Sequence, residues 1–259
     1  MLLAIDIGNS TISVGLFGEG ARLVFISSLN TDKNATCDQC AIAIMNLFRL
    51  YKCDLAAVTG AIVCSVVPPV TSSVAAAIET LFGKPPMVVG PGIKTGLNIK
   101  TEIHAQLGSD IVASAVSALN KYKTPIVVID MGTATTFSLI SERNTFEGCI
   151  IFPGVRIALE ALSEHAAQLP FISIDTPDSL IGKNTIDSMR SGILYGNAGM
   201  IDNVIGRIEE TAGSVSTVVA TGGNAPLILP QCRRSIIYNK DLLMEGLYLI
   251  YYRNAECCR

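Results

Sequence analysis

The sequence is poor in charge, and its charged residues form no cluster of one sign. Only 16% of the 259 residues are Asp, Glu, Lys or Arg, and the net charge is −3. Nucleic acids and anionic membrane surfaces are bound mainly through basic patches, and the sequence has no long basic run. We therefore expect neither nucleic acid nor a membrane as a partner.

Long apolar runs are also missing. None approaches the roughly 20 residues that a helix needs to cross a bilayer. Met1 leads directly into an apolar segment, without the basic region and cleavage site of an export signal. We therefore expect a cytoplasmic protein.

Histidine is scarce, and the eight cysteines are not spaced as metal ligands. Cys37 and Cys40 belong to residues 37–50, where apolar residues recur at the spacing of an amphipathic helix. His104 and His165 are far from this pair in sequence. Zinc would need a second close pair of cysteines or nearby histidines. We expect reduced thiols instead of a zinc or redox centre.

Apolar residues, in contrast, make up 49% of the chain, and 259 residues are enough for one large or two modest α/β domains. The segment 124–137, TPIVVIDMGTATTF, indicates how they are organised. Its β-branched residues 126–129 predict a buried strand that ends at Asp130. Gly132 and three threonines follow.

A near copy of this segment opens the chain. Residues 3–5 are apolar, Asp6 follows them, and Gly8 comes two positions later. We interpret the repeat as an internal duplication, which predicts two α/β domains at residues 1–121 and 122–259.

Each repeat ends in residues that suit a phosphate. Glycine lets a ligand approach the backbone, and hydroxyl and amide groups can donate hydrogen bonds to an anion. A carboxylate can hold a hydrated Mg²⁺ ion. Two such loops facing each other would bind a nucleoside triphosphate. For either loop alone, a hairpin turn without function is an equally good interpretation.

A third acid stands at the start of a predicted helix. Gly108, Ser109 and Asp110 lead into residues 111–121. Ser109 is expected to be the N-cap, which would place Asp110 in the first turn. The helix dipole favours an ionised carboxylate there, so an acid at this position does not by itself indicate catalysis.

Short motifs follow one another along nearly the whole chain: DIGNS (6–10), GIKTGL (92–97), GSD (108–110), DMGTATT (130–136), PG (153–154), GKNT (182–185), SG (191–192), YG (195–196) and TGG (221–223). Their order resembles that of the type III pantothenate kinases. Several blocks at compatible spacing are more specific than any single block.

The resemblance implies a fold, an activity and an assembly. The fold would be α/β, with duplicated actin-like (ribonuclease H-like) domains of mixed sheets flanked by helices. This is the superfamily of acetate kinase, sugar kinases, heat-shock chaperones and actin. The activity would be ATP-dependent phosphorylation of pantothenate to 4′-phosphopantothenate, the first step of coenzyme A biosynthesis. A homodimer with its interface near the pantothenate pocket would be the active form.

The resemblance also assigns roles to residues. Asp110 would be the catalytic base, Asp6 would be associated with Mg²⁺, and Asp130 would hold a monovalent cation, K⁺ or NH₄⁺. The residues expected to bind ATP and its phosphates are Asp6, Ile7, Gly8, Asn9, Ser10, Thr11, Ile12, Ser13 and Thr133. Those expected to bind pantothenate are Thr101, Gly108, Ser109, Asp110, Ile111 and Thr185.

The sequence departs from the family pattern where the acceptor is bound. The usual segment resembles Tyr-Asp-Asn-Pro-x-Glu-Val-Gly-Ala-Asp-Arg, and it corresponds here to residues 101–111, TEIHAQLGSDI. Thr101 replaces the aromatic residue, and Ile111 replaces the arginine. A guanidinium offers a fork of donors to a carboxylate, and isoleucine offers none.

Three interpretations remain open at this point. The chain is an active pantothenate kinase, a kinase of the same architecture for another small alcohol, or a non-catalytic nucleotide-binding regulator. Retention of Asp6, Asp110, Asp130 and Thr133 argues against the regulator, because a binding module needs no base. The changes at positions 101 and 111 argue for the second or third interpretation.

Overall fold

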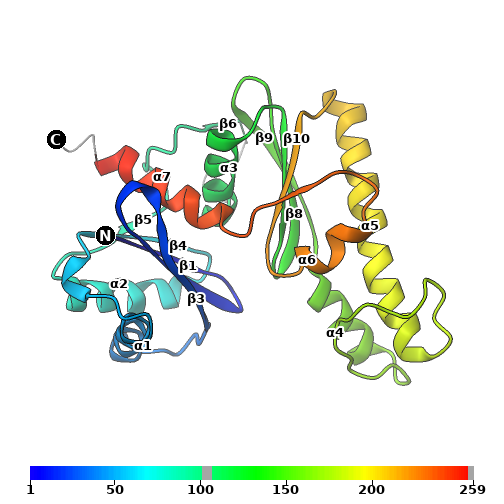
Figure 1. Cartoon of the computed structure of the whole chain (residues 1–259), viewed down its shortest axis with the longest axis horizontal. Coiled ribbons are helices and arrows are strands. Elements are labelled where there is room, and N and C mark those ends of the chain that lie inside the picture. The colour runs from blue at the N-terminus through cyan, green and yellow to red at the C-terminus, as the bar shows by residue number, and fades with distance from the viewer. Residues whose placement is uncertain (101–106, 256–259) are drawn as a thin grey trace. The chain divides into compact units, whose positions relative to one another are not determined.

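The computed structural model describes residues 1–100 and 107–255 (Figure 1). The strands are β1 (Leu2–Ile7), β2 (Thr11–Phe17), β3 (Leu23–Asn30), β4 (Gly60–Ser65), β5 (Met87–Val88), β6 (Asn98–Ile99), β7 (Ile126–Met131), β8 (Ala134–Ile140), β9 (Thr145–Pro153), β10 (Thr217–Thr221) and β11 (Ile237–Tyr238). The helices are α1 (Cys37–Leu50), α2 (Pro68–Phe82), α3 (Ser109–Lys121), α4 (Val155–His165), α5 (Thr185–Ala212), α6 (Ala225–Ile228) and α7 (Leu242–Ala255), with short 3-10 turns at Glu19–Ala21, Leu55–Ala57 and Leu229–Gln231.

The chain forms two compact units. The first contains residues 1–97, 107–117 and 241–255, and the second contains residues 98–100 and 118–240. The sequence predicted a division at residues 121 and 122. Strand β6, which precedes that point, pairs with β9 in the second sheet, and the start of the second unit at residue 118 lies close to the predicted boundary. The closing helix α7, however, lies in the first unit, because it packs on β1 and β4 and because the Phe17 and Tyr248 rings meet there at 5.1 Å.

The sheet of the first unit has the strand order β3-β2-β1-β4-β5. Strands β1, β2 and β3 form an antiparallel meander, while β4 and β5 run parallel to β1. Leu3, Ile5 and Ile7 on β1 pack with α1 and α2 into one core (Figure 1). Because side chains alternate along a strand, Asp6 points to the opposite face of the sheet.

Helix α1 confirms the prediction for residues 37–50. Thr36 accepts a hydrogen bond from the Gln39 amide, and the Gln39 side chain accepts one from the Thr36 amide. This capping box satisfies two backbone donors at the helix start. Ile44, Leu47 and Phe48 form the buried face.

The sheet of the second unit repeats the first. Its order is β11-β10-β7-β8-β9-β6, so that β9-β8-β7-β10-β11 matches β3-β2-β1-β4-β5. The directions match as well, with β7, β8 and β9 antiparallel in turn and β10 and β11 parallel to β7. The predicted duplication and the α/β class with mixed sheets are therefore confirmed.

The core of the second unit lies between this sheet and helices α4, α5 and α6 (Figure 1). Helix α5 buries Leu194, Ala198, Ile201, Ile205 and Ile208, the three- and four-residue spacing of one helix face. Within residues 1–100 and 107–255, no helix is both long and apolar enough to span a membrane.

Two buried serines on α3 predict opposite effects on stability. The Ser114 hydroxyl has no hydrogen-bond partner among the described residues, whereas the Ser117 hydroxyl donates to the Glu245 carboxylate at 3.2 Å. A buried polar group without a partner costs about 1–3 kcal/mol, and a made hydrogen bond contributes about 1 kcal/mol. We expect Ser114→Ala to raise the free energy of unfolding by about 1 kcal/mol and Ser117→Ala to lower it by a similar amount.

Urea unfolding of the two variants measures this difference, since the substitution and the helix are the same. Destabilisation by Ser114→Ala equal to that by Ser117→Ala would contradict the assignment.

Candidate active site

The first predicted phosphate loop is the turn between β1 and β2. The Gly8 amide donates to the Thr11 carbonyl at 3.0 Å, and the Thr31 hydroxyl donates to the Gly8 carbonyl at 2.7 Å. The side chains of Asn9, Ser10 and Thr11 are exposed. The loop is therefore a hairpin turn braced from beyond the end of β3, and its tip presents amide and hydroxyl groups to solvent.

Two residues predicted to bind ATP cannot do so with their side chains. Ile7 and Ile12 face each other across the turn, and both side chains are buried in the core with α1 and α2. Asp6 and Ser13 are the next pair, and they lie on the opposite face of the sheet. Only the backbones of Ile7 and Ile12 are open to a ligand.

Asp6 and Asp110 approach the same buried thiol. Strands β1 and β4 run parallel, with Asp6 opposite Cys64. The Cys64 side chain is fully buried. Burial raises the pKa of this thiol well above its usual value, and the negative charges of Asp6 and, more weakly, of Asp110 raise it further. Two acids from separate sequence motifs of the first unit therefore act on the same thiol.

Asp110 lies in the first turn of α3, as predicted. Its Oδ1 atom accepts a hydrogen bond from the Ile111 amide at 2.9 Å. A Cβ atom at Gly108 would overlap this oxygen. Because Gly108 has no side chain, there is room beside it for the Asp110 carboxylate.

Ser109 does not act as the N-cap that the sequence predicted. The helix begins at Ser109 itself, and the Val112 amide bonds to the Gly108 carbonyl. The Ser109 hydroxyl turns instead to the end of β4, where it donates to the Ser65 carbonyl at 3.1 Å. The Ser109 hydroxyl therefore bonds to a residue distant in the sequence, and not to a backbone amide of its own helix as an N-cap would.

The second predicted phosphate loop joins β7 and β8 in the second unit. The Gly132 amide donates to the Ala134 carbonyl at 3.1 Å, and Thr133 is exposed at the tip. Asp130 is the penultimate residue of β7 and lies opposite Thr136. Thr135, in contrast, is fully buried, so its hydroxyl is not offered to a ligand as the sequence suggested.

Two glycines from elsewhere in the second unit press on this loop. A Cβ atom at Gly154 would lie 2.6 Å from the Gly132 carbonyl oxygen, and it would also overlap Thr133. A Cβ atom at Gly222, whose φ is +96°, would lie 2.6 Å from the Met131 carbonyl. Both glycines belong to short motifs that carry the family resemblance, PG (153–154) and TGG (221–223), but their packing on this loop depends on the folded chain.

Thr185 is the first residue of α5 and lines an open pocket of about 800 Å³ in the second unit. Asn184 caps the helix by accepting a hydrogen bond from the Asp187 amide at 2.9 Å. The pocket is lined by apolar and by polar side chains: Leu162, Leu169, Met189 and Ile193, with Lys183, Asn184, Thr185 and Ser188.

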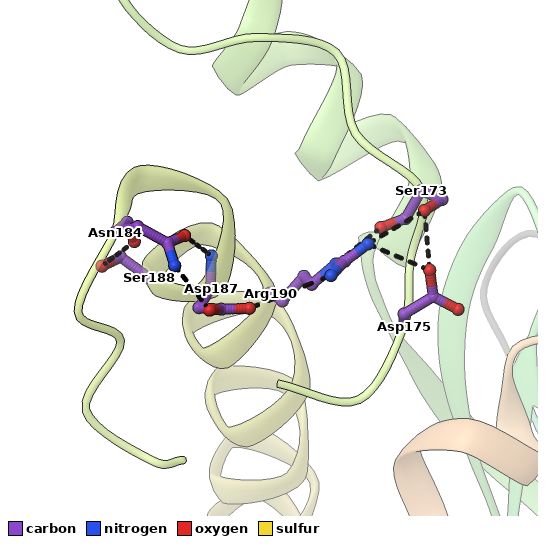
Figure 2. A network of polar contacts seen from close by, with 6 residues as sticks. All are labelled: Ser173, Asp175, Asn184, Asp187, Ser188 and Arg190. Atoms are coloured by element: carbon purple, nitrogen blue, oxygen red, sulfur yellow. Dashed lines mark hydrogen bonds and ion pairs between the residues drawn. The ribbon is translucent and has the colours of Figure 1, made fainter. Parts of the chain in front are cut away.

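A network of polar contacts holds the segment before Thr185 (Figure 2). Arg190 on α5 donates to the Ser173 hydroxyl at 3.2 Å and to Asp175 Oδ2 at 3.1 Å. Its guanidinium also lies 3.9 Å from the Asp187 carboxylate. The start of α5, and with it one side of the pocket, is therefore tied to residues 173–175.

Two further positions were predicted to bind the acceptor, Thr101 and Ile111. Thr101 lies outside the described residues. Ile111 is half-buried in the first turn of α3.

Among residues 1–100 and 107–255, no cluster of three or more His, Cys, Asp or Glu residues could hold a metal ion. Cys37, Cys40 and the other described cysteines are free thiols.

The close approach of Gly154 to the second loop predicts that this position tolerates no side chain. We expect Gly154→Ala to force the Gly132–Thr133 turn to move and to lower the free energy of unfolding by about 1–3 kcal/mol, the usual range for overpacking. Gly206→Ala on α5 is the matched control, because a Cβ atom there makes only an ordinary contact with Arg234 at 3.7 Å.

Urea unfolding of both variants provides the comparison. The control should be neutral or slightly stabilising, since alanine is the better helix former. Equal stability of the two variants would show that the loop yields to a side chain at Gly154.

Comparison with known proteins places this site in a family. The chain is 42% identical over 256 residues to a type III pantothenate kinase of Brevibacillus brevis, covering 99% of this chain and 100% of the relative. It is 40% identical over 255 residues to one of Bacillus cytotoxicus, covering 98% and 97%.

Solved structures agree on the fold. The activator of the 2-hydroxyisocaproyl-CoA dehydratase from Clostridium difficile, with bound ADPNP, superposes with a TM-score of 0.62 at 10% identity, covering 99% of this chain and 96% of that one. Component A of the Acidaminococcus fermentans (R)-2-hydroxyglutaryl-CoA dehydratase has a TM-score of 0.57 at 16% identity, covering 98% of each chain. The sequence model described as type III pantothenate kinase matches residues 2–207, and the chain belongs to that family.

Proposed function

We propose that this chain transfers the γ-phosphoryl group of ATP to the primary alcohol of pantothenate, as a cytoplasmic enzyme of coenzyme A biosynthesis. Family membership supports the two substrates. The observation that carries the proposal is geometric: Asp6 lies opposite Cys64 in the β1–β4 register, and the Cys64 thiol donates a hydrogen bond to Ser109, the residue before Asp110. It puts a candidate base near a candidate metal-associated acid, which is the pairing that phosphoryl transfer requires.

Asp110 acts as the base in this proposal. An ionised carboxylate is too weak a base to remove the proton of a primary alcohol early in the reaction. It orients the hydroxyl, whose oxygen attacks the γ-phosphorus, and accepts the proton late in a loose transition state. The bond between the γ-phosphorus and the oxygen bridging it to the β-phosphate breaks, and ADP leaves.

The exposed tips of the two loops are suited to the phosphates of ATP. Asn9, Ser10 and Thr11 offer donors in the first unit, and Thr133 offers a hydroxyl in the second. The Asp6 carboxylate and its neighbouring oxygen groups suit a hydrated Mg²⁺ ion, which keeps most of its own waters. When bound, Mg²⁺ neutralises the charge that builds up on the phosphates.

Asp130 is proposed to hold a monovalent cation, K⁺ or NH₄⁺. It is the penultimate residue of β7 in the second sheet, as Asp6 is the penultimate residue of β1 in the first. The family resemblance supports the role, and a carboxylate is a suitable oxygen ligand for such a cation.

By family resemblance, Gly108, Ser109 and Ile111 of the first unit, Thr185 of the second unit and Thr101 are each proposed to contact the acceptor. Within the second unit, the pocket beside Thr185 has both apolar and polar lining side chains, which suit a small amphipathic molecule. Ile111 favours one alternative, a different small alcohol, because the family's guanidinium is missing at that position.

The active form is proposed to be a homodimer formed through the second unit. Ile151 on β9 is 66% exposed and Phe171 is 70% exposed. Further exposed apolar side chains in the same unit are Ile150, Phe152, Ile157, Leu162, Leu180, Ile181 and Ile186. Exposed apolar side chains in this number suit a protein–protein interface. The family resemblance implies that the partner is a second copy of the chain.

The kinase assignment predicts that ADP formation requires pantothenate. Purified protein with ATP, Mg²⁺ and K⁺ should release ADP when pantothenate is added, and mass detection should find 4′-phosphopantothenate. Asp110→Asn should fold and bind ATP normally but lose at least about a hundredfold in kcat, because a positioned base contributes that much or more.

Absence of product from folded wild-type protein that binds ATP would reject pantothenate as the acceptor and lead to a screen of other small alcohols. Near-normal turnover by Asp110→Asn would remove Asp110 from the role of base.

The dimer proposal predicts that a charge introduced among the exposed apolar side chains of the second unit produces monomers. Ile151→Lys should shift the mass in light scattering from two chains to one, because a buried ammonium without a partner is costly. Leu50→Lys is the control, since Leu50 is 69% exposed but lies on α1 in the first unit. A monomeric wild type, or dimers of both variants, would refute the proposed interface.

A further inference from the structure

Ser109 differs from the usual family segment within the motif that carries the proposed base. The segment that the motif resembles has alanine at this position, and alanine forms no side-chain hydrogen bond. The structure shows the Ser109 hydroxyl engaged in the first unit, away from the backbone amides of its own helix. The family resemblance assigns Ser109 to acceptor binding, and it does not explain these contacts of the hydroxyl with β4.

The Ser109 hydroxyl uses all of its hydrogen-bonding capacity at the end of β4. It donates to the Ser65 carbonyl at 3.1 Å and accepts from the Ser65 amide at 3.2 Å. The Cys64 thiol donates to it at 3.2 Å. A hydroxyl has one proton and two lone pairs, so these contacts satisfy it completely.

The end of β4 is itself a firm anchor. The Ser65 hydroxyl accepts hydrogen bonds from the Val67 amide at 3.0 Å and from the Thr71 hydroxyl at 2.7 Å. These bonds connect the strand to the beginning of α2. A group that is tied to Ser65 is therefore tied to the core of the first unit.

The neighbouring Asp110 depends on the same short stretch of backbone. Its Oδ1 atom accepts the Ile111 amide proton and lies against Gly108. A shift of residues 108–111 would move the carboxylate with them. Cys64 adds a link to the other acid, because it faces Asp6 across the β1–β4 ladder and bonds to Ser109.

We propose that Ser109 is a positioning residue whose hydroxyl ties the start of α3 to β4 and thereby fixes the Asp110 carboxylate relative to Asp6. The inference rests on the proposed function for its effect on catalysis. The tie itself is a property of the fold and is measurable without a substrate.

Ser109→Ala tests the proposal against a matched control. Its kcat with ATP and pantothenate should fall at least about five-fold, while KM for ATP stays within about two-fold, because a small misplacement of a base is costly to the chemical step. Ser117→Ala removes a buried hydroxyl from the same helix, where it bonds to Glu245 and not to β4, and should keep the wild-type kcat. Ser109→Thr retains the hydroxyl and should restore most of the activity.

Amide hydrogen exchange of residues 107–115 provides a readout that needs no activity. Exchange in the first turn of α3 should speed up in Ser109→Ala and not in Ser117→Ala. An unchanged exchange rate in Ser109→Ala would show that the Ser109 hydroxyl does not hold the start of α3 to β4. An unchanged kcat in Ser109→Ala would show that Ser109 does not position Asp110. A wild type without pantothenate-dependent turnover rejects the proposed function alone, because the exchange measurement still decides whether the tie exists.

Discussion

The parallel pairing of β1 with β4 is the constraint on which the candidate site in the first unit depends. It brings Cys64 opposite Asp6 and places both strand ends at one edge of the sheet, where ligands of open α/β sheets are bound. Helix α3 starts against this edge through Ser65 and Ser109. Without this register, Asp6 and Asp110 would be acids in unrelated motifs, and no thiol would lie near both.

The second unit uses the same strand order but stabilises its loop differently. In the first unit a threonine hydroxyl braces the turn, and in the second the backbones of Gly154 and Gly222 pack directly on it. Direct packing of backbone on backbone leaves no room for adjustment, because protein interiors are close-packed. The duplicated loops have therefore kept the acid at the strand end while the support around them has diverged.

Local patterns in the sequence were enough for the features that are themselves local. The duplication, the helix at residues 37–50 and the place of Asp110 in a first turn followed from spacing and composition. The features that could not be predicted depend on contacts between distant segments. Ser109 was expected to cap its own helix and instead found Ser65, and α7 joined the first unit because it packs on β1 and β4. The burial of Ile7 and Ile12 follows from strand alternation, but only once the strand limits are known.

Two departures from the family pattern, Ser109 and Ile111, flank the proposed base Asp110. One bears on the placement of the base and the other on acceptor binding. Ile111 stands where the family pattern has a guanidinium that could recognise a carboxylate, so in the proposed function it bears on how the acceptor is bound. Ser109 adds a hydroxyl that bonds to β4, so it acts on where Asp110 stands. Binding of the acceptor and placement of the base contribute separately to the rate, because the first is felt mainly in KM and the second in kcat. A chain that gives up a recognition contact while gaining a contact that holds its base is consistent with retained chemistry and altered acceptor recognition.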